Sequence, residues 1–353
     1  MTLEELGYTD AIDKHRKEHG LESFEVGRVV SEHKERYAVK TPEKEFDAEL
    51  IGNLRFTAAN RYDFPAVGDW VAFTEFDEGK ALIHALYPRK SKLERKAVGK
   101  AGQVQLIATN VDYGFIVQAV DRDFNVNRLE RYLTICYAAK IQPLIVLSKT
   151  DLTSASDLES LIAQVKQRIK EVPVIPVSLT GGYEKLKPHI KSGLTYCLLG
   201  SSGVGKSTLL NSLSGKEQML TGEISSSVNK GRHVTSHREL FVLENGGILI
   251  DNPGMREVGI TDAGEGLNNT FNSIMDFAED CLFPDCTHIH EKDCAVLEAL
   301  AKGEIDQDSY SNYQKMEKEK KHFESDALER KKKDKDLGKV IKEFKKHRKN
   351  NKF

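Results

Sequence analysis

Eight residues from Gly200 to Ser207 form a loop suited to holding phosphate groups. Their sequence, GSSGVGKS, matches the pattern G-x-x-x-x-G-K-[ST] in full and lies between an apolar run and a helix-forming run, which argues against a glycine-rich turn that binds nothing. Glycines let backbone N–H groups surround phosphate oxygens, and a helix N-terminus adds favourable partial charge. We expect Lys206 to reach the β- and γ-phosphates and Ser207 to bind Mg²⁺. The predicted phosphate-binding residues are Gly200, Ser201, Ser202, Gly203, Val204, Gly205, Lys206, Ser207 and Thr208.

A second candidate element is Asp251-Asn-Pro-Gly254, which follows the apolar run GILI. In GTPases a strand-end carboxylate lies near Mg²⁺, and a glycine three residues later contacts the γ-phosphate. D-x-x-G alone is a weak signal, but Asp251 lies on a predicted strand 51 residues after Gly200. We therefore predict Asp251 as a magnesium ligand and Gly254 as a γ-phosphate contact.

A third element, Ser148-Lys149-Thr150-Asp151, follows the apolar run PLIVL. GTPases carry N-K-x-D at this place, where the aspartate accepts two hydrogen bonds from guanine and the lysine stem packs along the ring. Here Ser148 replaces the asparagine and cannot supply a carboxamide. Ser178, which follows VPVIPV, is predicted to contact the base through its backbone. A strand-end loop with a helix cap is the alternative.

Three cysteines and a histidine make a candidate metal site. Cys281, Cys286, His288 and Cys294 fall within 14 residues. Cys₃His is a complete tetrahedral zinc set with no open position, so we predict one structural Zn²⁺. The sequence has no C-x-x-C, which argues against a redox pair. Cys136 and Cys197 stand alone in apolar segments, as buried thiols do, and a reducing compartment follows.

The elements that must position these residues change in type along the chain. Five short strands punctuated by Gly and Pro occupy about residues 24–87 and favour an OB-like barrel. Strands alternate with helices from Asn110, which indicates an open, mostly parallel sheet with helices on both faces. One of these helices is expected to begin at a capping box, Ser156 to Glu159. The expected divisions are 1–22 (leader or helix), 23–90 (barrel), 91–109 (linker), 110–268 (GTPase domain), 269–314 (helical zinc-binding domain) and 315–353 (basic helical tail).

The order of the three nucleotide elements is permuted. A Ras-like chain runs from the P-loop to D-x-x-G and then N-K-x-D, whereas this chain runs from SKTD to the P-loop and then to DNPG. The same sheet forms if the chain is opened elsewhere, because the ends of a domain often lie close together at its surface. The segment after Gly254 then leads toward the cysteine cluster, so movement there could reach the C-terminal domain.

Taken together, these features resemble the RsgA/YjeQ family of circularly permuted GTPases. The resemblance covers nearly the whole chain and includes VGDWV, PRKSKLERK, LLGSSGVGKSTLLNSL, KGRHVTSHREL, IDNPGMRE and CAVLEALAKGEI. It implies a GTP hydrolase that binds the small ribosomal subunit and its rRNA, acts late in assembly of that subunit, and couples nucleotide state to binding and release. We expect GTP with Mg²⁺ and one Zn²⁺ as bound groups, a monomer, and a cytoplasmic location without membrane association.

The resemblance also identifies a first switch at Gly231-Arg-His-Val-Thr235. Thr235 would be the second hydroxyl on Mg²⁺, and His233 would position the attacking water; contact of His233 with rRNA or phosphate is the alternative. Met255 follows Gly254, where Ras-like enzymes have a water-positioning glutamine. Because methionine cannot orient water, we expect hydrolysis to be slow alone and faster on the small subunit.

Charge is unevenly distributed along the 353 residues, whose net charge of -2 would by itself argue against a nucleic-acid partner. Residues 315–353 hold 16 Lys and Arg against 8 Asp and Glu, and the rest of the chain is acidic. The tail is therefore predicted to contact rRNA phosphates, with a simply solvated helix as the alternative.

Two other functions compete with a GTP hydrolase. The first is an RNA-binding assembly factor whose nucleotide site is a switch with negligible turnover, which Met255 and Ser148 favour. The second is a P-loop kinase acting on a small molecule, against which the strand-end SKTD and DNPG motifs argue.

Overall fold

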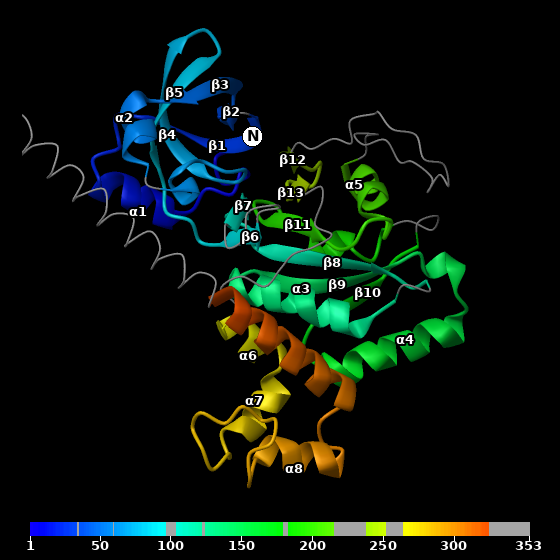
Figure 1. The fold of residues 1–353 in the computed structure, drawn as a ribbon. Helices are drawn as coiled ribbons and strands as arrows, with labels where there is room; N and C mark the ends of the chain where they lie inside the picture. Colours follow the sequence, from blue (N-terminus) through cyan, green and yellow to red (C-terminus); the bar gives the residue numbers. More distant parts are fainter. Residues whose placement is uncertain are drawn as a thin grey trace, which may run out of the picture.

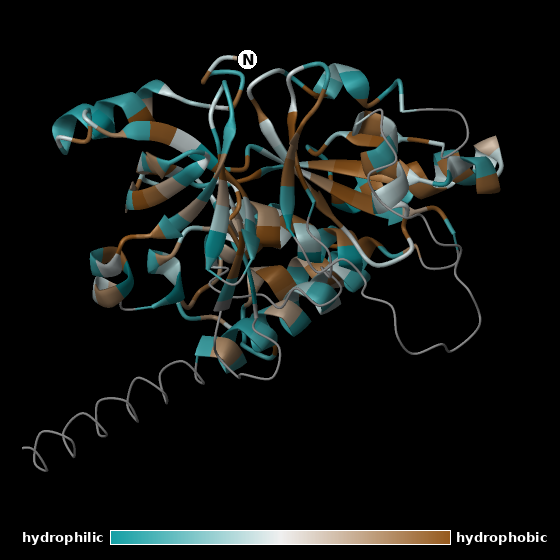
Figure 2. Cartoon of the chain, turned by 90° about the horizontal axis from the view of Figure 1, so that it is seen from above, coloured by the Kyte–Doolittle hydropathy of each residue, from teal (hydrophilic) through white to brown (hydrophobic). Residues whose placement is uncertain are grey.

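The computed structural model describes residues 1–33, 35–58, 60–96, 104–121, 124–178, 183–214, 238–251 and 264–324. They form three parts: an N-terminal β-barrel, a central sheet covered by helices, and a set of C-terminal helices under one face of that sheet (Figure 1). Seen from above, the strands carry most of the hydrophobic colour and the outer helices are largely hydrophilic (Figure 2).

The barrel has the five strands that the sequence predicts. Each strand pairs with the next in the order β1-β2-β3-β5-β4, and β4 pairs with β1 to close the barrel. The β3–β5 pairing is parallel and the others are antiparallel. The strands are β1 (Glu25–His33), β2 (Arg36–Lys40), β3 (Glu45–Leu50), β4 (Trp70–Asp77) and β5 (Lys80–Leu86), with α2 (Gly52–Thr57) and the 3₁₀ turn η1 (Arg61–Asp63) between β3 and β4.

Alternation along the strands explains the closed barrel. In β3 every second residue is buried, so one face of the strand points inward and the other faces solvent. The inward side chains include Tyr37, Phe46 and Phe73. Trp70 is only 1% exposed and packs outside this core against Tyr8, near α1 (Asp10–Glu18).

Part of the expected linker is regular structure. Residues 91–109 include β6 (Lys92–Lys96) and β7 (Val104–Thr109), which form an antiparallel pair. The expectation of a linker without structure was therefore wrong for these residues. Apolar side chains on the inner face of the pair explain the difference, since Leu93 and Ala108 are fully buried in the core of the central domain.

The central sheet runs in the order β10-β9-β8-β11-β13-β12. All neighbours are parallel except β12 and β13. This confirms the expected open, mostly parallel sheet. Its elements are β8 (Tyr113–Ala119), α3 (Val126–Ala138), β9 (Gln142–Ser148), η2 (Thr150–Leu152), α4 (Ala155–Arg168), β10 (Val174–Pro176), η3 (Lys187–His189), β11 (Thr195–Leu199), α5 (Lys206–Ser214), β12 (Glu239–Val242) and β13 (Ile248–Asp251).

Two separate apolar clusters cover the two faces of this sheet. Leu129, Leu133 and other α3 residues pack on one face, and Leu209 and Leu210 of α5 pack on the other. The cap of helix α4 lies two residues before the predicted one. Its cap is Ser154, whose Oγ accepts the backbone N–H of Asp157 at 3.2 Å, so the Ser156–Glu159 assignment was wrong.

The C-terminal part consists of α6 (Gly264–Thr270), α7 (Asn272–Ala278), α8 (Ala295–Lys302) and a helix over residues 307–324. Their shared core includes Phe271, Val296 and Met316. The expected division between residues 314 and 315 falls within the last helix, and Met316 is fully buried. The described start of the basic tail is therefore packed against the protein.

A buried arginine joins the barrel to the central domain. Arg28 of β1 is 1% exposed, and its guanidinium donates to the carbonyls of Leu6 (2.6 Å) and Gly68 (3.2 Å) and to Thr195 Oγ1 (2.9 Å). Burial lowers the pKa of Arg28 to about 10. The sheets also meet where Ser31 of β1 pairs with Glu239 of β12. Among the described residues, no helix is long and apolar enough to cross a membrane.

Candidate nucleotide and metal sites

The phosphate loop, residues 200–207, connects the end of β11 to α5. Gly200 has a φ of +146° and lies so close to β8 that a Cβ there would come within 2.3 Å of the Val117 carbonyl oxygen, so only glycine fits. Gly203 and Gly205 also have positive φ. The loop therefore has the tight backbone turns that direct N–H groups toward a phosphate.

Lys206 lies in the first turn of α5 and folds over this loop. Its Nζ donates to the carbonyls of Gly200 at 2.8 Å and Ser201 at 2.5 Å. The ammonium group is thus held at the mouth of the loop, where phosphate oxygens can replace carbonyl oxygens as acceptors. Ser207 and Thr208 follow in the same turn and are half-buried.

Asp251 lies beside the phosphate loop because their two strands are neighbours. β11 and β13 are parallel, with Cys197 opposite Ile250, so Asp251 and Gly200 both lie at the carboxyl edge of the sheet. Asp251 is 8% exposed. The other residues predicted for this side of the site, His233, Thr235 and Gly254, lie outside the described residues.

The base loop, residues 148–151, lies at the same edge on β9. Lys149 adopts left-handed backbone geometry, and its Nζ forms an ion pair with Asp121 Oδ2 at 3.1 Å. Asp151 Oδ1 accepts a hydrogen bond from Ser178 Oγ at 2.9 Å. Ser148 Oγ donates to the Val204 carbonyl at 2.6 Å, which links the base loop to the phosphate loop.

Three of these contacts were not predicted. Asp121 was missed, although a carboxylate directly after the strand VDYGFIVQAV was a visible signal, because carboxyl ends of parallel strands share one edge. The side-chain hydrogen bond from Ser178 to Asp151 was not predicted either, and the predicted backbone contact of Ser178 with the base stays a prediction. No sequence pattern indicates a contact between Ser148 and Val204.

The predicted metal ligands come together. The ligand atoms of Cys281, Cys286, His288 and Cys294 all lie within 4.8 Å of one another. Cys281 Sγ is 3.8 Å from Cys294 Sγ, and His288 Nδ1 is 3.6 Å and 3.5 Å from these sulfurs. The group can therefore hold one metal ion with His288 binding through Nδ1.

The start of α8 favours the thiolate form of one ligand. Burial raises the pKa of the Cys281 thiol, but the backbone N–H groups of Val296 and Ala295 donate toward its sulfur, and the net effect is a lowered pKa. Burial also lowers the pKa of His288, which favours the neutral imidazole that a metal requires.

Residues that sequence reasoning missed hold the loop between His288 and Cys294. The Glu291 carboxylate accepts the N–H groups of Thr287 (3.0 Å), Ile289 (3.0 Å) and His290 (3.2 Å), together with the Thr287 hydroxyl. From the helix over 307–324, Tyr310 OH donates to the His288 carbonyl. The metal loop is thus attached to that helix.

The same helix also binds the central domain through a buried polar cluster. Glu130 of α3 is 1% exposed and accepts from Arg168 Nη2 (2.5 Å), Asn312 Nδ2 (2.6 Å) and Ser309 Oγ (3.2 Å). Burial raises the pKa of Glu130, and the hydrogen bonds from Arg168, Asn312 and Ser309 oppose that shift. An ion pair between Arg131 and Glu319 at 2.6 Å extends the contact.

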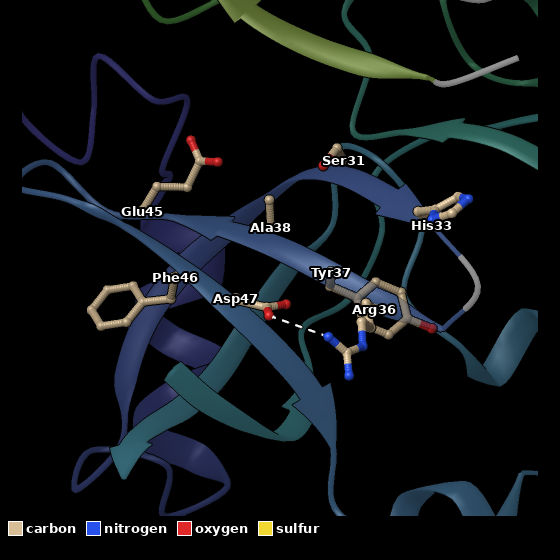
Figure 3. Close-up of a pocket in the computed structure, with 8 residues that line it drawn as sticks. All are labelled: Ser31, His33, Arg36, Tyr37, Ala38, Glu45, Phe46 and Asp47. Carbon is tan, nitrogen blue, oxygen red and sulfur yellow. Dashed lines mark ion pairs between the residues drawn. The ribbon is translucent and has the colours of Figure 1, made fainter. Parts of the chain in front are cut away.

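A pocket on the barrel lies apart from both sites. It has a volume of about 320 Å³ and is lined by residues of β1, β2 and β3 (Figure 3). Its arginine, Arg36, already pairs with Asp47 at 3.7 Å and with Glu49 at 3.4 Å. The lining is therefore of mixed charge, and the structure gives it no part in the nucleotide site.

Three elements lie at one edge of a parallel sheet: a P-loop, a strand-end aspartate and an S-K-x-D loop. Their order along the chain is permuted, and a closed barrel precedes them. Together these features define a circularly permuted P-loop GTPase. The family model described as RsgA GTPase matches residues 86–261. A model described as ABC transporter also matches, over residues 183–351, a segment that contains the P-loop common to both classes.

Curated relatives agree with the first model. The "small ribosomal subunit biogenesis GTPase RsgA" of Opitutus terrae is 41% identical over 331 residues, 90% of this chain and 90% of its own length. The "small ribosomal subunit biogenesis GTPase RsgA 1" of Bacteroides thetaiotaomicron is 38% identical over 347 residues, 98% and 97% of the two chains. The chain therefore belongs to the RsgA GTPase family, as its motifs predicted.

Solved structures support the fold. The crystal structure of YjeQ from Thermotoga maritima matches with a TM-score of 0.63 and 27% identity, over 82% of this chain and 96% of that one. The structure of YloQ, described as a circularly permuted GTPase, matches with a TM-score of 0.60 and 24% identity, over 88% and 98%. The predicted combination of OB-like barrel, permuted GTPase domain and C-terminal helical part is confirmed.

Proposed function

We propose that this chain hydrolyses GTP in the biogenesis of the small ribosomal subunit and that its nucleotide state controls binding to and release from that subunit. The observation that supports the proposal is that Lys206, Asp251 and the base loop lie at one edge of the central sheet. The chain is also about 40% identical to relatives named for this role. Loops at the carboxyl ends of parallel strands are where such sheets bind ligands.

Catalysis in this proposal is positional and electrostatic. Lys206 and the loop amides neutralise the charge that develops on the phosphates; Ser207 and Asp251 would hold a Mg²⁺ ion, which would supply further positive charge there. Thr235 completes the magnesium site, Gly254 contacts the γ-phosphate and His233 positions water; the family resemblance supports these three roles. Asp151 accepts hydrogen bonds from guanine.

Zn²⁺ is the proposed occupant of the Cys₃His cluster. In a tetrahedral zinc site with Zn–S of about 2.3 Å and Zn–N of about 2.0–2.1 Å, sulfur atoms lie about 3.8 Å apart and nitrogen lies about 3.6 Å from sulfur. The observed separations among Cys281, His288 and Cys294, of 3.8, 3.6 and 3.5 Å, agree with this geometry, and the Cys286 sulfur lies within 4.8 Å of these atoms. With four protein ligands the ion would have a structural role.

The proposed partner surface includes rRNA contacts by the basic tail and the barrel. The start of the tail is fixed to the protein through Met316 and Glu319, and OB-like barrels often bind nucleic acid, although that support comes from fold alone. We further propose that the chain acts as a cytoplasmic monomer.

The decisive experiment is the rate of hydrolysis of GTP and ATP with and without purified small ribosomal subunits. We expect slow GTP hydrolysis by the protein alone, at least tenfold faster hydrolysis with subunits, and little ATP hydrolysis. Equal GTP rates in both conditions would refute stimulation by the partner. Tight GTP binding without turnover in either condition would support the alternative of a nucleotide-controlled RNA-binding factor.

A further inference from the structure

Ser148 occupies the junction between the two nucleotide loops. It is the last residue of β9 and is 2% exposed, and its hydroxyl donates to the Val204 carbonyl at 2.6 Å. Because β8 lies between β9 and β11 in the sheet, this hydrogen bond crosses the end of β8 to reach the phosphate loop. The Val120 N–H donates to the Ser148 carbonyl at 3.0 Å, so the end of β8 is held at the same point.

Val204 needs such an anchor because of its neighbours. Gly203 and Gly205 have φ values of +80° and +93°, and glycine offers little intrinsic restriction of the backbone. The Val204 side chain is 6% exposed and packs in the core, while its carbonyl is held by Ser148. A carbonyl oxygen turned toward a phosphate would repel it, so the anchor keeps the loop in a phosphate-binding arrangement.

Serine has a single hydroxyl hydrogen, which limits how many hydrogen bonds Ser148 can donate. A hydroxyl has one hydrogen to donate, and here the Val204 carbonyl takes it. The guanine edge offers N7 and O6, which are both acceptors, so they require a donor. An asparagine has two N–H donors and could serve both a loop carbonyl and a base, but Ser148 cannot.

We propose that Ser148 is a positioning residue for the phosphate loop and takes no part in reading the base, so guanine recognition depends on Asp151 as oriented by Ser178. This inference rests on the proposed function, because it assumes that the site binds guanine nucleotides. It predicts that removing the Ser148 hydroxyl weakens nucleotide binding through the phosphates. The loss of affinity should therefore be the same for two nucleotides that differ only at N7 of the base.

The test compares Ser148→Ala with Ser148→Thr, which retains a hydroxyl, by measuring Kd for GDP, 7-deaza-GDP and GMP. Ser148→Ala should weaken GDP and 7-deaza-GDP binding by the same factor, about tenfold, because a buried carbonyl loses its donor. The loss should be smaller for GMP, which lacks the β-phosphate that the loop encloses. Ser148→Thr should restore most of the affinity.

The controls separate folding from binding. Ser160→Ala, which removes an exposed α4 hydroxyl that donates to Ser156, should leave all three Kd values unchanged. Thermal unfolding without nucleotide reports whether Ser148→Ala remains folded; if it does not, Ser148→Cys gives the same comparison at similar volume with a weaker donor.

Two results would overturn the inference. A loss for GDP that is absent for 7-deaza-GDP would mean that Ser148 donates to N7. Unchanged affinity for every nucleotide would mean that the link to Val204 contributes nothing to binding. Failure of the wild-type protein to prefer GDP over ADP would instead refute the proposed function and is seen before any variant is made.

Discussion

At the scale of single residues, polar contacts within the protein hold the side chains at the edge of the sheet that carries the nucleotide motifs. Lys206 is held by loop carbonyls, Lys149 by Asp121, and Asp151 by Ser178. Each contact limits the rotamers of a side chain that would otherwise lose freedom on binding, which reduces the entropic cost of association. The sequence predicted the residue types at this edge, but these supporting contacts depend on loops that meet only in the folded sheet.

The hydroxyl of Ser178 should determine how well the site distinguishes guanine from hypoxanthine. IDP lacks the 2-amino group of GDP, so it offers Asp151 one hydrogen bond in place of two. Ser178→Ala removes the hydrogen bond that orients Asp151 Oδ1, and we expect the preference for GDP over IDP to fall about fivefold, which is the value of one ordinary hydrogen bond. Calorimetric Kd values for both nucleotides give the ratio. An equal loss of affinity for GDP and IDP would contradict the orienting role.

Glu291 should control how firmly the metal is held, although it is not a ligand. Glu291→Ala removes the acceptor that gathers the N–H groups next to His288, so we expect metal release to a chromophoric chelator to be about tenfold faster. The matched control is Glu298→Ala on α8, whose carboxylate pairs only with exposed Lys302 among its described partners. Release rates that are the same in both variants would show that the loop holds its shape without Glu291.

At the scale of elements, the prediction was correct where the local sequence pattern itself determines the structure. The barrel strands and the central strands were found because alternating or continuous apolar runs set which face is buried. Residues 91–109 were misread as a linker because β6 and β7 are buried only after they pack on the central domain. The cap at Ser154 was missed because Ser154 and Ser156 fit the same pattern, and only the backbone decides between them.

The contact between α3 and the helix over residues 307–324 could not be read from sequence, and it should be a main determinant of stability. Removing Glu130 takes away the nearer carboxylate and leaves buried Arg168 only its longer ion pair with Asp306 at 3.7 Å, so Glu130→Ala should lower the free energy of unfolding by about 3 kcal/mol. The double variant Glu130→Ala/Arg168→Ala should lose less than the sum of the single losses, because the second change removes the poorly paired buried charge. Urea unfolding measures all three variants, and additive losses would argue against coupling.

At the scale of the whole molecule, the permuted order places the C-terminal part after the strand that carries Asp251. The strand carrying Asp251 leads toward the C-terminal part, which packs on α3 through Glu130 and Arg131 and holds the metal loop through Tyr310. The helix over residues 307–324 therefore touches both the central domain and the metal loop.

The end of the tail can be removed while the tail residues that the structure describes as packed are kept, which makes its role testable. The buried residue Met316 and the paired residue Glu319 both precede residue 330. Deleting residues 330–353 removes 12 Lys and Arg and 3 Asp and Glu. We expect weaker binding to small subunits and a flatter dependence of log K on log salt, by roughly 0.7–0.9 for each phosphate that the tail no longer neutralises.

Binding measured between about 50 and 200 mM salt, a range over which ionic binding to phosphates weakens strongly, gives that slope. A full-length variant with every tail lysine replaced by arginine is the matched control, because it keeps the charge and should keep the slope. Weaker affinity with an unchanged slope would point to non-ionic binding by the tail. Unchanged affinity and slope would mean that residues 330–353 are a solvated extension and that the partner binds elsewhere on the molecule.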